Sequence, residues 1–332
     1  MERTKRPGKT TAAAKTADAI LVSDLHLTES APVSRTDNYW EAQKEKLRFL
    51  AGLSKKNGGC PILCAGDIFD YWKASPWLCA EIFCRLPHPF VGIPGQHDLP
   101  AHSLDNYHRS ALSLLEVAET AAGRRFHILK GGTVVLTGGF PFSVTGIPYG
   151  KVEECLSKGI PRLPTEGRRI LLLHELTWPG RRPAWSESGY TDRELLEMFG
   201  ERFDLIVTGD NHAGFLTRRK GSLLVNPGSM MRITADQADY TPRCYLYYAE
   251  DNAVKPVPFP IKENVHNREH LDRKNEREER IAAYIERMNE NWEIGLSFRK
   301  NLEAFFAENK TPRKIRELIW EHFEEEKGRE AR

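Results

Sequence analysis

Five short apolar runs, each followed by side chains that can bind metal, constrain the fold of this 332-residue chain more than any other feature. The runs lie at residues 19–22, 61–65, 90–93, 170–173 and 205–208, and their length is typical of buried strands. The side chains that follow them are Asp24 and His26; Asp67 and Asp70; Gln96, His97 and Asp98; His174 and Glu175; and Asp210 and His212. Sheets flanked by helices gather strand ends along one edge, so these loops can converge on one site.

The spacing within two of these loops supports a shared site. Asp24 and His26 are two residues apart, and Asp210 and His212 repeat that spacing. On an extended backbone, both members of such a pair point to the same face. Taken alone, Asp24 could cap a turn and His26 could be an ordinary surface histidine, but the repetition along the chain favours a metal site. Gly95, one residue before Gln96, is expected to adopt a backbone angle that other residues avoid.

The segments between the runs predict a layered α/β protein. Apolar residues at helical spacing predict helices over residues 41–56, 77–86 and 103–120. Strand, polar loop, helix and strand thus recur in order, which indicates an α/β architecture. Over residues 126–147 the apolar residues alternate with Gly and Thr, which predicts antiparallel strands that carry the chain from one sheet to a second.

As an ordered set, these motifs resemble the calcineurin-like metallophosphoesterases over roughly residues 18–260. The resemblance rests on Asp24-x-His26, Gly66-Asp67-x-x-Asp70, Gln96-His97-Asp98, His174 and Asp210-x-His212, and on a turn at residues 225–229 that is similar to the family's closing turn. It implies a sandwich of two mixed β-sheets flanked by helices. Residues 66–70, residues 97–100 and the helical tail are similar to the SbcD-like DNA repair nuclease branch.

The resemblance also implies two metal ions with a shared ligand. One ion would be held by Asp24, His26, Asp67 and His212, and the other by Asp67, Gln96, His174 and Asp210, with Asp67 bridging. The family usually has Asn at position 96 and His at position 210. Both substitutions keep an oxygen ligand that suits a hard or borderline divalent ion, and they affect only the second metal site.

Such a site supports phosphodiester hydrolysis. Two divalent ions lower the pKa of a shared water, supply it as the hydroxide nucleophile and neutralise charge on the phosphoryl group. Oxygen and imidazole ligands suit Mn, Fe, Mg or Zn, and Mn is the first choice. His97 is the candidate proton donor to the leaving oxygen. Asp70 matches the family position that orients this histidine. A structural hydrogen bond to a loop carbonyl is the alternative role for His97, and Asp98 could simply cap its loop.

Bulk composition places few limits on the partners. The net charge of +2 gives no global sign of nucleic-acid binding, so any basic surface must be local. Six cysteines without a Cys-x-x-Cys pair indicate reduced thiols and a cytoplasmic protein. No apolar run approaches the length of a membrane span, so no membrane partner is expected.

Composition divides the chain into three parts. Residues 1–17 are predicted to be a disordered basic arm, residues 18–261 the catalytic domain and residues 262–332 a helical C-terminal extension. The extension carries apolar stripes at Ile281–Trp292, around Leu302, and at Ile315–Phe323. These stripes either pack within the protein or dock a partner, which the resemblance implies to be a coiled-coil ATPase. A homodimer is a further option.

The expected function is that of a DNA exo- or endonuclease subunit. Arg181 and Arg182 lie among aromatic residues in a predicted loop at 178–191, where they could hold a phosphate backbone and stack on a base or sugar. Alternatively, the Pro and Trp residues of this loop only pin it to the body of the protein. Arg218 and Arg219 are expected at a hairpin tip, solvated unless the hairpin faces the site. The alternatives are a phosphatase or diesterase for a small nucleotide or lipid-linked diphosphate, and a non-catalytic scaffold with the same fold.

Overall fold

The computed structural model describes residues 15–137, 139–160, 163–267 and 298–320. The chain divides into two compact units, Met1–Asn267 and Arg268–Arg332. The first unit carries the whole predicted site, and the second contains the C-terminal helices.

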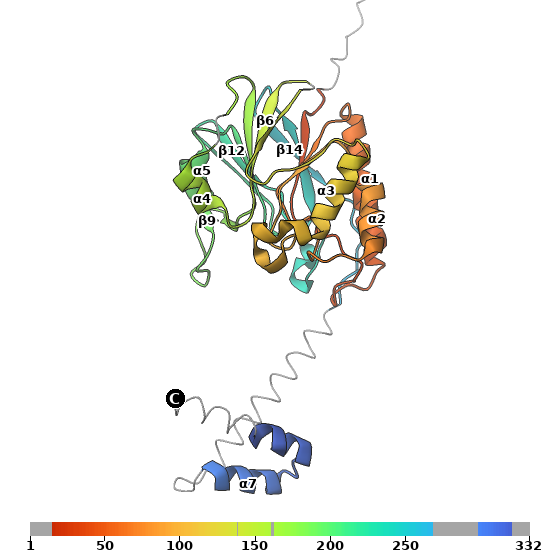
Figure 1. Cartoon of the computed structure of the whole chain (residues 1–332), viewed down its shortest axis with the longest axis vertical. Coiled ribbons are helices and arrows are strands. Elements are labelled where there is room, and N and C mark those ends of the chain that lie inside the picture. Colours follow the sequence, from red (N-terminus) through yellow and green to blue (C-terminus); the bar gives the residue numbers. More distant parts are fainter. Residues whose placement is uncertain (1–14, 138, 161–162, 268–297, 321–332) are drawn as a thin grey trace, which may run out of the picture. The chain divides into compact units, whose positions relative to one another are not determined.

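The first unit contains two six-stranded mixed sheets (Figure 1). The strand order of the first sheet is β14-β13-β1-β2-β3-β4. Its strands are β1 (Ala19–Val22), β2 (Ile62–Cys64), β3 (Phe90–Gly92), β4 (Phe126–Ile128), β13 (Arg243–Tyr248) and β14 (Ala253–Pro258). Strands β1 to β4 run parallel, so the carboxyl ends of β1, β2 and β3 lie along one edge.

The second sheet has the strand order β11-β12-β10-β7-β6-β5. Its strands are β5 (Thr133–Leu136), β6 (Phe142–Ile147), β7 (Arg168–Leu173), β10 (Leu205–Thr208), β11 (Phe215–Arg219) and β12 (Ser222–Asn226). The four central strands are parallel, and antiparallel strands close both edges. A small parallel pair, β8 (Thr177–Trp178) and β9 (Tyr190–Thr191), brackets the predicted 178–191 loop.

Helices cover the outer face of each sheet, which gives four layers (Figure 1). The helices are α1 (Tyr39–Lys56), α2 (Pro76–Arg85) and α3 (Ala111–Ala121), which pack on the first sheet, and α4 (Val152–Lys158) and α5 (Asp192–Phe199), which pack on the second. Between the sheets lies an apolar core that includes Leu21, Leu63 and Val91 from one side and Leu172 and Val207 from the other. Burial on both faces explains why these strands read as continuous apolar runs.

The predicted sandwich of two mixed β-sheets flanked by helices is therefore confirmed, with two local corrections. The predicted helix over 103–120 begins only at Ala111, after two 3-10 turns (Pro100–His102 and Leu104–Arg109). The Ser110 side chain caps α3 by accepting from the Ser113 amide at 3.1 Å. Residues 126–147 are not all antiparallel, because β4 pairs in parallel with β3 in the first sheet and only β5 and β6 form a hairpin.

The ends of the predicted catalytic domain pack more tightly than their composition indicates. Ala17, assigned to the basic arm, is buried, whereas residues 1–14 lie outside the described part. At the other end, the Thr36 amide donates to the Val265 carbonyl at 3.1 Å, and the Asn267 amide donates to the Ser34 carbonyl at 2.8 Å. Residues 262–267 therefore belong to the first unit by their contacts.

The second unit is helical where it is described. Helix α7 (Phe298–Glu308) buries Leu302, Phe305 and Phe306, and residues 313–320 are helical as well. Ile319 and Trp320 pack against this cluster, as expected for part of the last stripe. Ile315 and Leu318 are exposed, while the predicted stripe over 281–292 and Phe323 lie outside the described residues. Among the helices that are described, none is long and apolar enough to cross a membrane.

Candidate metal centre

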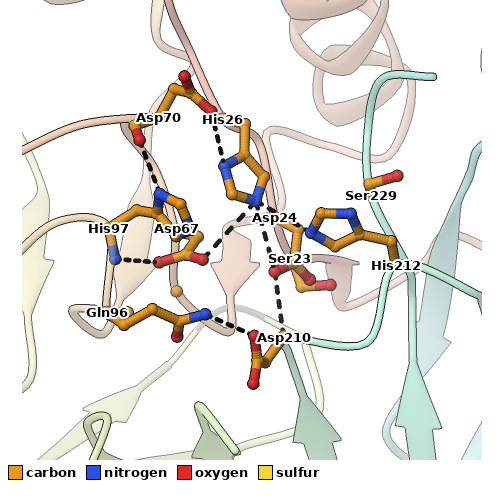
Figure 2. A network of polar contacts seen from close by, with 12 residues as sticks. Ser23, Asp24, His26, Asp67, Asp70, Gln96, His97, Asp210, His212 and Ser229 are labelled. Carbon is orange, nitrogen blue, oxygen red and sulfur yellow. Dashed lines mark hydrogen bonds and ion pairs between the residues drawn. The ribbon is translucent and has the colours of Figure 1, made fainter. Parts of the chain in front are cut away.

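Six of the seven predicted ligands are labelled in Figure 2, where they meet at the shared edge of the two sheets, and His174 joins them through its contact with Gln96. Loops that follow β1, β2 and β3 supply Asp24, His26, Asp67 and Gln96, and loops that follow β7 and β10 supply His174, Asp210 and His212. Side chains from distant parts of the sequence are in contact, since the Nε2 atoms of His26 and His212 lie 3.1 Å apart. The site is thus built from both sheets.

The backbone at these positions is not the extended one that the sequence spacing suggested. Asp24, His26, Asp67 and Asp210 have φ angles of 50°, 43°, 50° and 74°, in the left-handed region. Strand β1 has already ended at Val22, and the chain turns sharply against the next loop: the Asp24 amide donates to the Gly66 carbonyl at 3.1 Å, and the His26 amide to the Asp67 carbonyl at 3.0 Å. Non-glycine residues hold such angles only where surrounding contacts fix them, and they cluster at functional sites.

Asp67 lies at the centre of the cluster. Its side chain is fully buried, and its Oδ1 accepts a hydrogen bond from the His97 amide at 2.9 Å. Its Oδ2 lies 3.6 Å from His26 Nε2 and 3.5 Å from His174 Nε2, and has no hydrogen bond. Burial by itself raises the pKa of Asp67, but the neighbouring His174 and His26 outweigh it and hold the pKa below its usual range. The carboxylate is therefore anionic, with one oxygen facing both predicted ion positions.

The first predicted ligand group fits a cation. Asp24 Oδ1 lies 3.9 Å from His26 Nε2, and Asp24 Oδ2 is buried without a hydrogen bond. The ligand atoms of Asp24, His26 and His212 lie within 4.8 Å of one another. Burial raises the pKa of Asp24 above its usual range, because a buried carboxylate oxygen without a partner is costly. Two imidazole nitrogens in contact can share only one proton. A divalent ion among these atoms would satisfy all of them.

The second group fits a cation by its hydrogen-bond pattern. His174 Nδ1 lies 2.6 Å from the Ala65 carbonyl and its Nε2 lies 2.6 Å from Gln96 Oε1. Both acceptors need a proton from the ring, so the histidine is cationic without metal. Burial lowers the pKa of His174, but Asp67 reverses this and the pKa is about 10. An ion at Nε2 would take the place of that proton and would be in reach of Gln96, whose amide nitrogen donates to Asp210 Oδ1.

His97 and Asp70 meet differently from what the resemblance implies. His97 Nδ1 donates to the backbone carbonyl of Asp70 at 2.7 Å, which leaves Nε2 available. The Asp70 carboxylate instead binds His26 Nδ1 at 3.2 Å. Burial lowers the pKa of His26, but Asp70, Asp67 and Asp24 raise it to a net value of about 9. Asp70 therefore orients a candidate metal ligand, His26, with its side chain and the candidate proton donor, His97, with its backbone.

Asp98 and two glycines fit the loops together. The Asp98 carboxylate is buried and accepts from the amides of Ile68, Phe69 and Gly95 at 3.1, 2.9 and 3.0 Å. This matches the loop-capping role considered for it. Gly95 does not have the unusual backbone angle that the sequence suggested; a Cβ there would collide with Asp67 Oδ1, so glycine is required by close approach. Gly66 is required in the same way, because a Cβ there would collide with the His174 ring.

Sequence reasoning missed the support behind Asp24 and His212. The Met230 amide donates to the Asp24 carbonyl at 3.0 Å, and the Ser229 amide donates to the His212 carbonyl at 3.1 Å. The buried Lys46 side chain of α1 donates to the Met230 carbonyl at 2.5 Å and so fixes this turn. Lys46 precedes Leu50 and Leu53 at helical spacing on the buried face of α1, and a lysine on an apolar stripe was the available signal.

The family model for calcineurin-like phosphoesterases matches residues 19–214, more than half of the chain. The chain belongs to this family. Family membership makes it a metal-dependent phosphoesterase, and the family typically uses a dinuclear metal site, for which the ligand groups above provide the residues. No curated protein matches the sequence.

Several solved structures resemble the phosphoesterase fold described here. One is TT1561 of Thermus thermophilus, with 14% identity and a TM-score of 0.46, covering 74% of this chain and 100% of that one. A novel archaeal phosphodiesterase has 11% identity and a TM-score of 0.36, with coverages of 72% and 98%. The phosphopantetheinyl hydrolase of Mycobacterium tuberculosis has 14% identity and a TM-score of 0.44, with coverages of 74% and 97%.

The two arginine-containing loops have different positions. Lys220 and Gly221 form the tip of the β11–β12 hairpin. This tip comes before the start of β12, so it lies at the edge of the sheet opposite the metal centre. Arg218 there donates to the Asn252 carbonyl at 3.1 Å, so the hairpin does not face the site. The 178–191 loop follows β7 at the metal-centre edge, and its Trp178 and Trp185 rings are 5.3 Å apart.

Proposed function

We propose that this phosphoesterase is a DNA nuclease that hydrolyses phosphodiesters with two divalent ions, manganese being the preferred metal. The observation that carries the proposal is the pair of buried, unpartnered oxygens, Asp24 Oδ2 and Asp67 Oδ2, set among four histidines. Oxygen and imidazole ligands without a thiolate favour manganese over softer ions.

The residues of this chain divide the work of hydrolysis. When bound, the ions would supply Lewis-acid stabilisation of the phosphoryl oxygens and a water of lowered pKa. Asp67 would hold both ions, Asp24, His26 and His212 the first, and Gln96, His174 and Asp210 the second. Asp70 keeps His26 oriented through Nδ1, and Ala65 does the same for His174. Fixed ring orientation is what supporting contacts contribute to a metal site.

In this proposal, His97 protonates the leaving oxygen. Its Nδ1 is held by the Asp70 carbonyl, so a proton on Nε2 is the one available for transfer. The His97 ring lies 4.9 Å from the ring of the candidate ligand His26, in an edge-to-face arrangement. It is therefore next to the candidate ligands. A general acid in this position contributes about 10²- to 10⁴-fold to the rate.

DNA as the substrate is supported by the loop between β8 and β9. Trp185 is 78% exposed there, and Arg181 is exposed in the same loop. Exposed aromatic rings and arginines beside a phosphoesterase centre are the features by which proteins bind single strands. The SbcD-like role and a coiled-coil ATPase partner belong to the same proposal, supported by the exposed Ile315 and Leu318 of the second unit.

A substitution at the bridging position tests the chemistry. Asp67→Asn keeps the shape of the side chain and removes the charge that both ions share. We expect manganese content, measured on the purified protein, to fall, and hydrolysis of bis-p-nitrophenyl phosphate to drop by at least about 100-fold. Hydrolysis at the wild-type rate would refute the two-metal proposal. A wild-type enzyme that cleaves mononucleotides but neither labelled linear DNA nor the diester would refute the nuclease assignment alone.

A further inference from the structure

A groove of about 440 Å³ lies between the loop after Asp70 and the start of α3. We call it the basic groove; the residues that matter in its wall are Trp72, Lys73, His108, Arg109, Leu114 and Val117. None of the residues that line it is acidic. Its volume is within the range of pockets that hold small ligands or one nucleotide-sized group.

The groove is joined to the proton-donor side of the centre by short, fixed connections. Trp72 comes two residues after Asp70, so their Cα atoms are at most about 7 Å apart. The Asp70 carbonyl accepts from His97 Nδ1 at 2.7 Å, and the Trp72 carbonyl accepts from the Ala111 amide at 2.7 Å. These bonds tie His97, the loop and α3 together. The wall of the basic groove at Trp72 is therefore only a short loop away from His97.

The positive charges of the groove are not neutralised. Lys73 and Arg109 are exposed and form no ion pair with any residue in the part of the chain that the structure describes. The second cavity near this edge, of about 240 Å³, differs in this respect. Its three lysines, Lys130, Lys151 and Lys158, are each paired with Glu116 or Glu154 at 2.7 Å. Of these two cavities, the basic groove is the one whose basic side chains can pair with the phosphates of a polyanion.

The groove also has an apolar surface that a phosphate alone would not need. Trp72 is partly exposed, with the exposed Tyr71 ring 5.5 Å away, and Leu114 and Val117 are 57% and 65% exposed. Cations beside an aromatic face match the alternating phosphates and bases of a single strand, because every base can stack and every phosphate can pair.

We propose that the basic groove binds a single-stranded segment of the DNA substrate next to the scissile phosphate, with Lys73 and Arg109 on phosphates and Trp72 against a base. This proposal rests on the nuclease function proposed above and adds where the strand lies. It assigns specificity to a surface outside the metal ligands.

The test is binding of a fluorescein-labelled decathymidylate to the full chain without metal, over a range of salt concentrations. The double variant Lys73→Ala/Arg109→Ala removes two phosphate contacts. We expect about tenfold or greater loss of affinity, with the slope of log affinity against log salt reduced by about 1.4, since each contact with a single strand contributes roughly 0.7. The matched control is Lys55→Ala/Lys56→Ala, two exposed lysines at the end of α1, which should bind as the wild type does.

Stacking is tested separately. Trp72→Leu should weaken binding of decathymidylate but not of an abasic decamer of the same length, because only the former offers bases. Equal affinity of the groove double variant and its control for decathymidylate would overturn the proposal. So would an equal loss of binding for polyglutamate, because this would mean that the groove attracts any polyanion.

Failure of the groove and failure of the nuclease function give different results. With manganese, a groove variant is expected to lose at least tenfold more activity on decathymidylate than on bis-p-nitrophenyl phosphate. Equal losses on both substrates would overturn the groove, while the diesterase activity itself would still stand. Wild-type protein that hydrolyses neither substrate with any divalent metal would overturn the nuclease function, whereas the metal-free binding comparison would still decide the groove.

Discussion

His97 has one ring nitrogen committed to the backbone and one nitrogen available for chemistry. The Asp70 carbonyl holds Nδ1 at 2.7 Å, and the carboxylate of Asp70 is occupied by His26. The loop itself is anchored through the His97 amide, which donates to Asp67 Oδ1 at 2.9 Å. Since that anchor is a backbone group, the His97 side chain can be changed without removing it.

His97→Gln is therefore expected to retain both ions and to lose rate. The loss should reach about 10²- to 10⁴-fold on a dinucleotide, whose alkoxide leaving group needs a proton. On bis-p-nitrophenyl phosphate the loss should be smaller, because p-nitrophenolate leaves without protonation. Steady-state rates on both substrates, with metal content determined on the same samples, check the prediction. An equal loss on the two substrates would contradict the acid role.

The convergence of the candidate ligand residues on one edge was predictable from the sequence, but the way in which they meet was not. Asp24, Asp67 and His174 each follow an apolar run, and parallel strand ends collect at one edge whatever the details of the turns. The left-handed backbone at Asp24 and His26 depends on hydrogen bonds to the neighbouring loop, which no local pattern encodes. For the same reason, the pairing of the Asp70 carboxylate with His26 could not be read from the spacing.

The loop after β3 packs directly against the loop after β2, because the backbone of Gly95 lies against Asp67. Gly95→Ala would place a methyl group in collision with Asp67 Oδ1. We expect weaker manganese binding and loss of hydrolysis, because Asp67 must move. Gly52→Ala is the control, since nothing lies within 4 Å of a Cβ at this α1 position, and it should raise thermal stability slightly. Metal titration and thermal unfolding of both variants decide the point; unaltered affinity in Gly95→Ala would contradict it.

Helix α1 contributes a pH dependence through Lys46. Burial, together with the charges of Arg35 and Arg232, lowers the pKa of Lys46 to about 7 from 10.5. Between these values the unfolded chain binds more protons than the folded one, so stability increases as pH rises from about 7 towards 10. In Lys46→Met this rise should be smaller by more than about 1 kcal/mol. Urea unfolding of metal-free protein at pH 6.5 and 9.5 measures it, and an unchanged pH dependence would contradict the assignment.

Elements with a strong period were predicted well, and elements set by tertiary contacts were not. The five apolar runs became β1, β2, β3, β7 and β10, and the Leu-rich stripe after residue 40 became α1. The start of α3 depends on the Ser110 cap and on the 3-10 turn that precedes it. The residues of that turn resemble a helix in composition, so the sequence alone could not separate the two. The sheet that β4 joins is fixed by pairing with β3, which residue alternation cannot specify.

For the whole molecule, the contacts of residues 262–267 place the end of the first unit after Asn267. A chain of residues 1–267 is expected to fold and to hydrolyse bis-p-nitrophenyl phosphate at close to the full-length rate. A chain of residues 1–261 loses the buried Val265 and two backbone hydrogen bonds, and should melt roughly 4 °C lower. Thermal melts of the two fragments compare them. Identical melting temperatures would show that composition, rather than these contacts, marks the boundary.

Asp67 follows a strand of one sheet and His174 follows a strand of the other. Bound ions would therefore cross-link the two sheets at one edge. Ligand binding and folding are linked, so a substitution that destabilises the packing between the two sheets must also weaken metal binding. Leu63 and Val207 lie in the apolar layer between the two sheets. We therefore expect metal affinity to depend on this apolar layer as well as on the ligands.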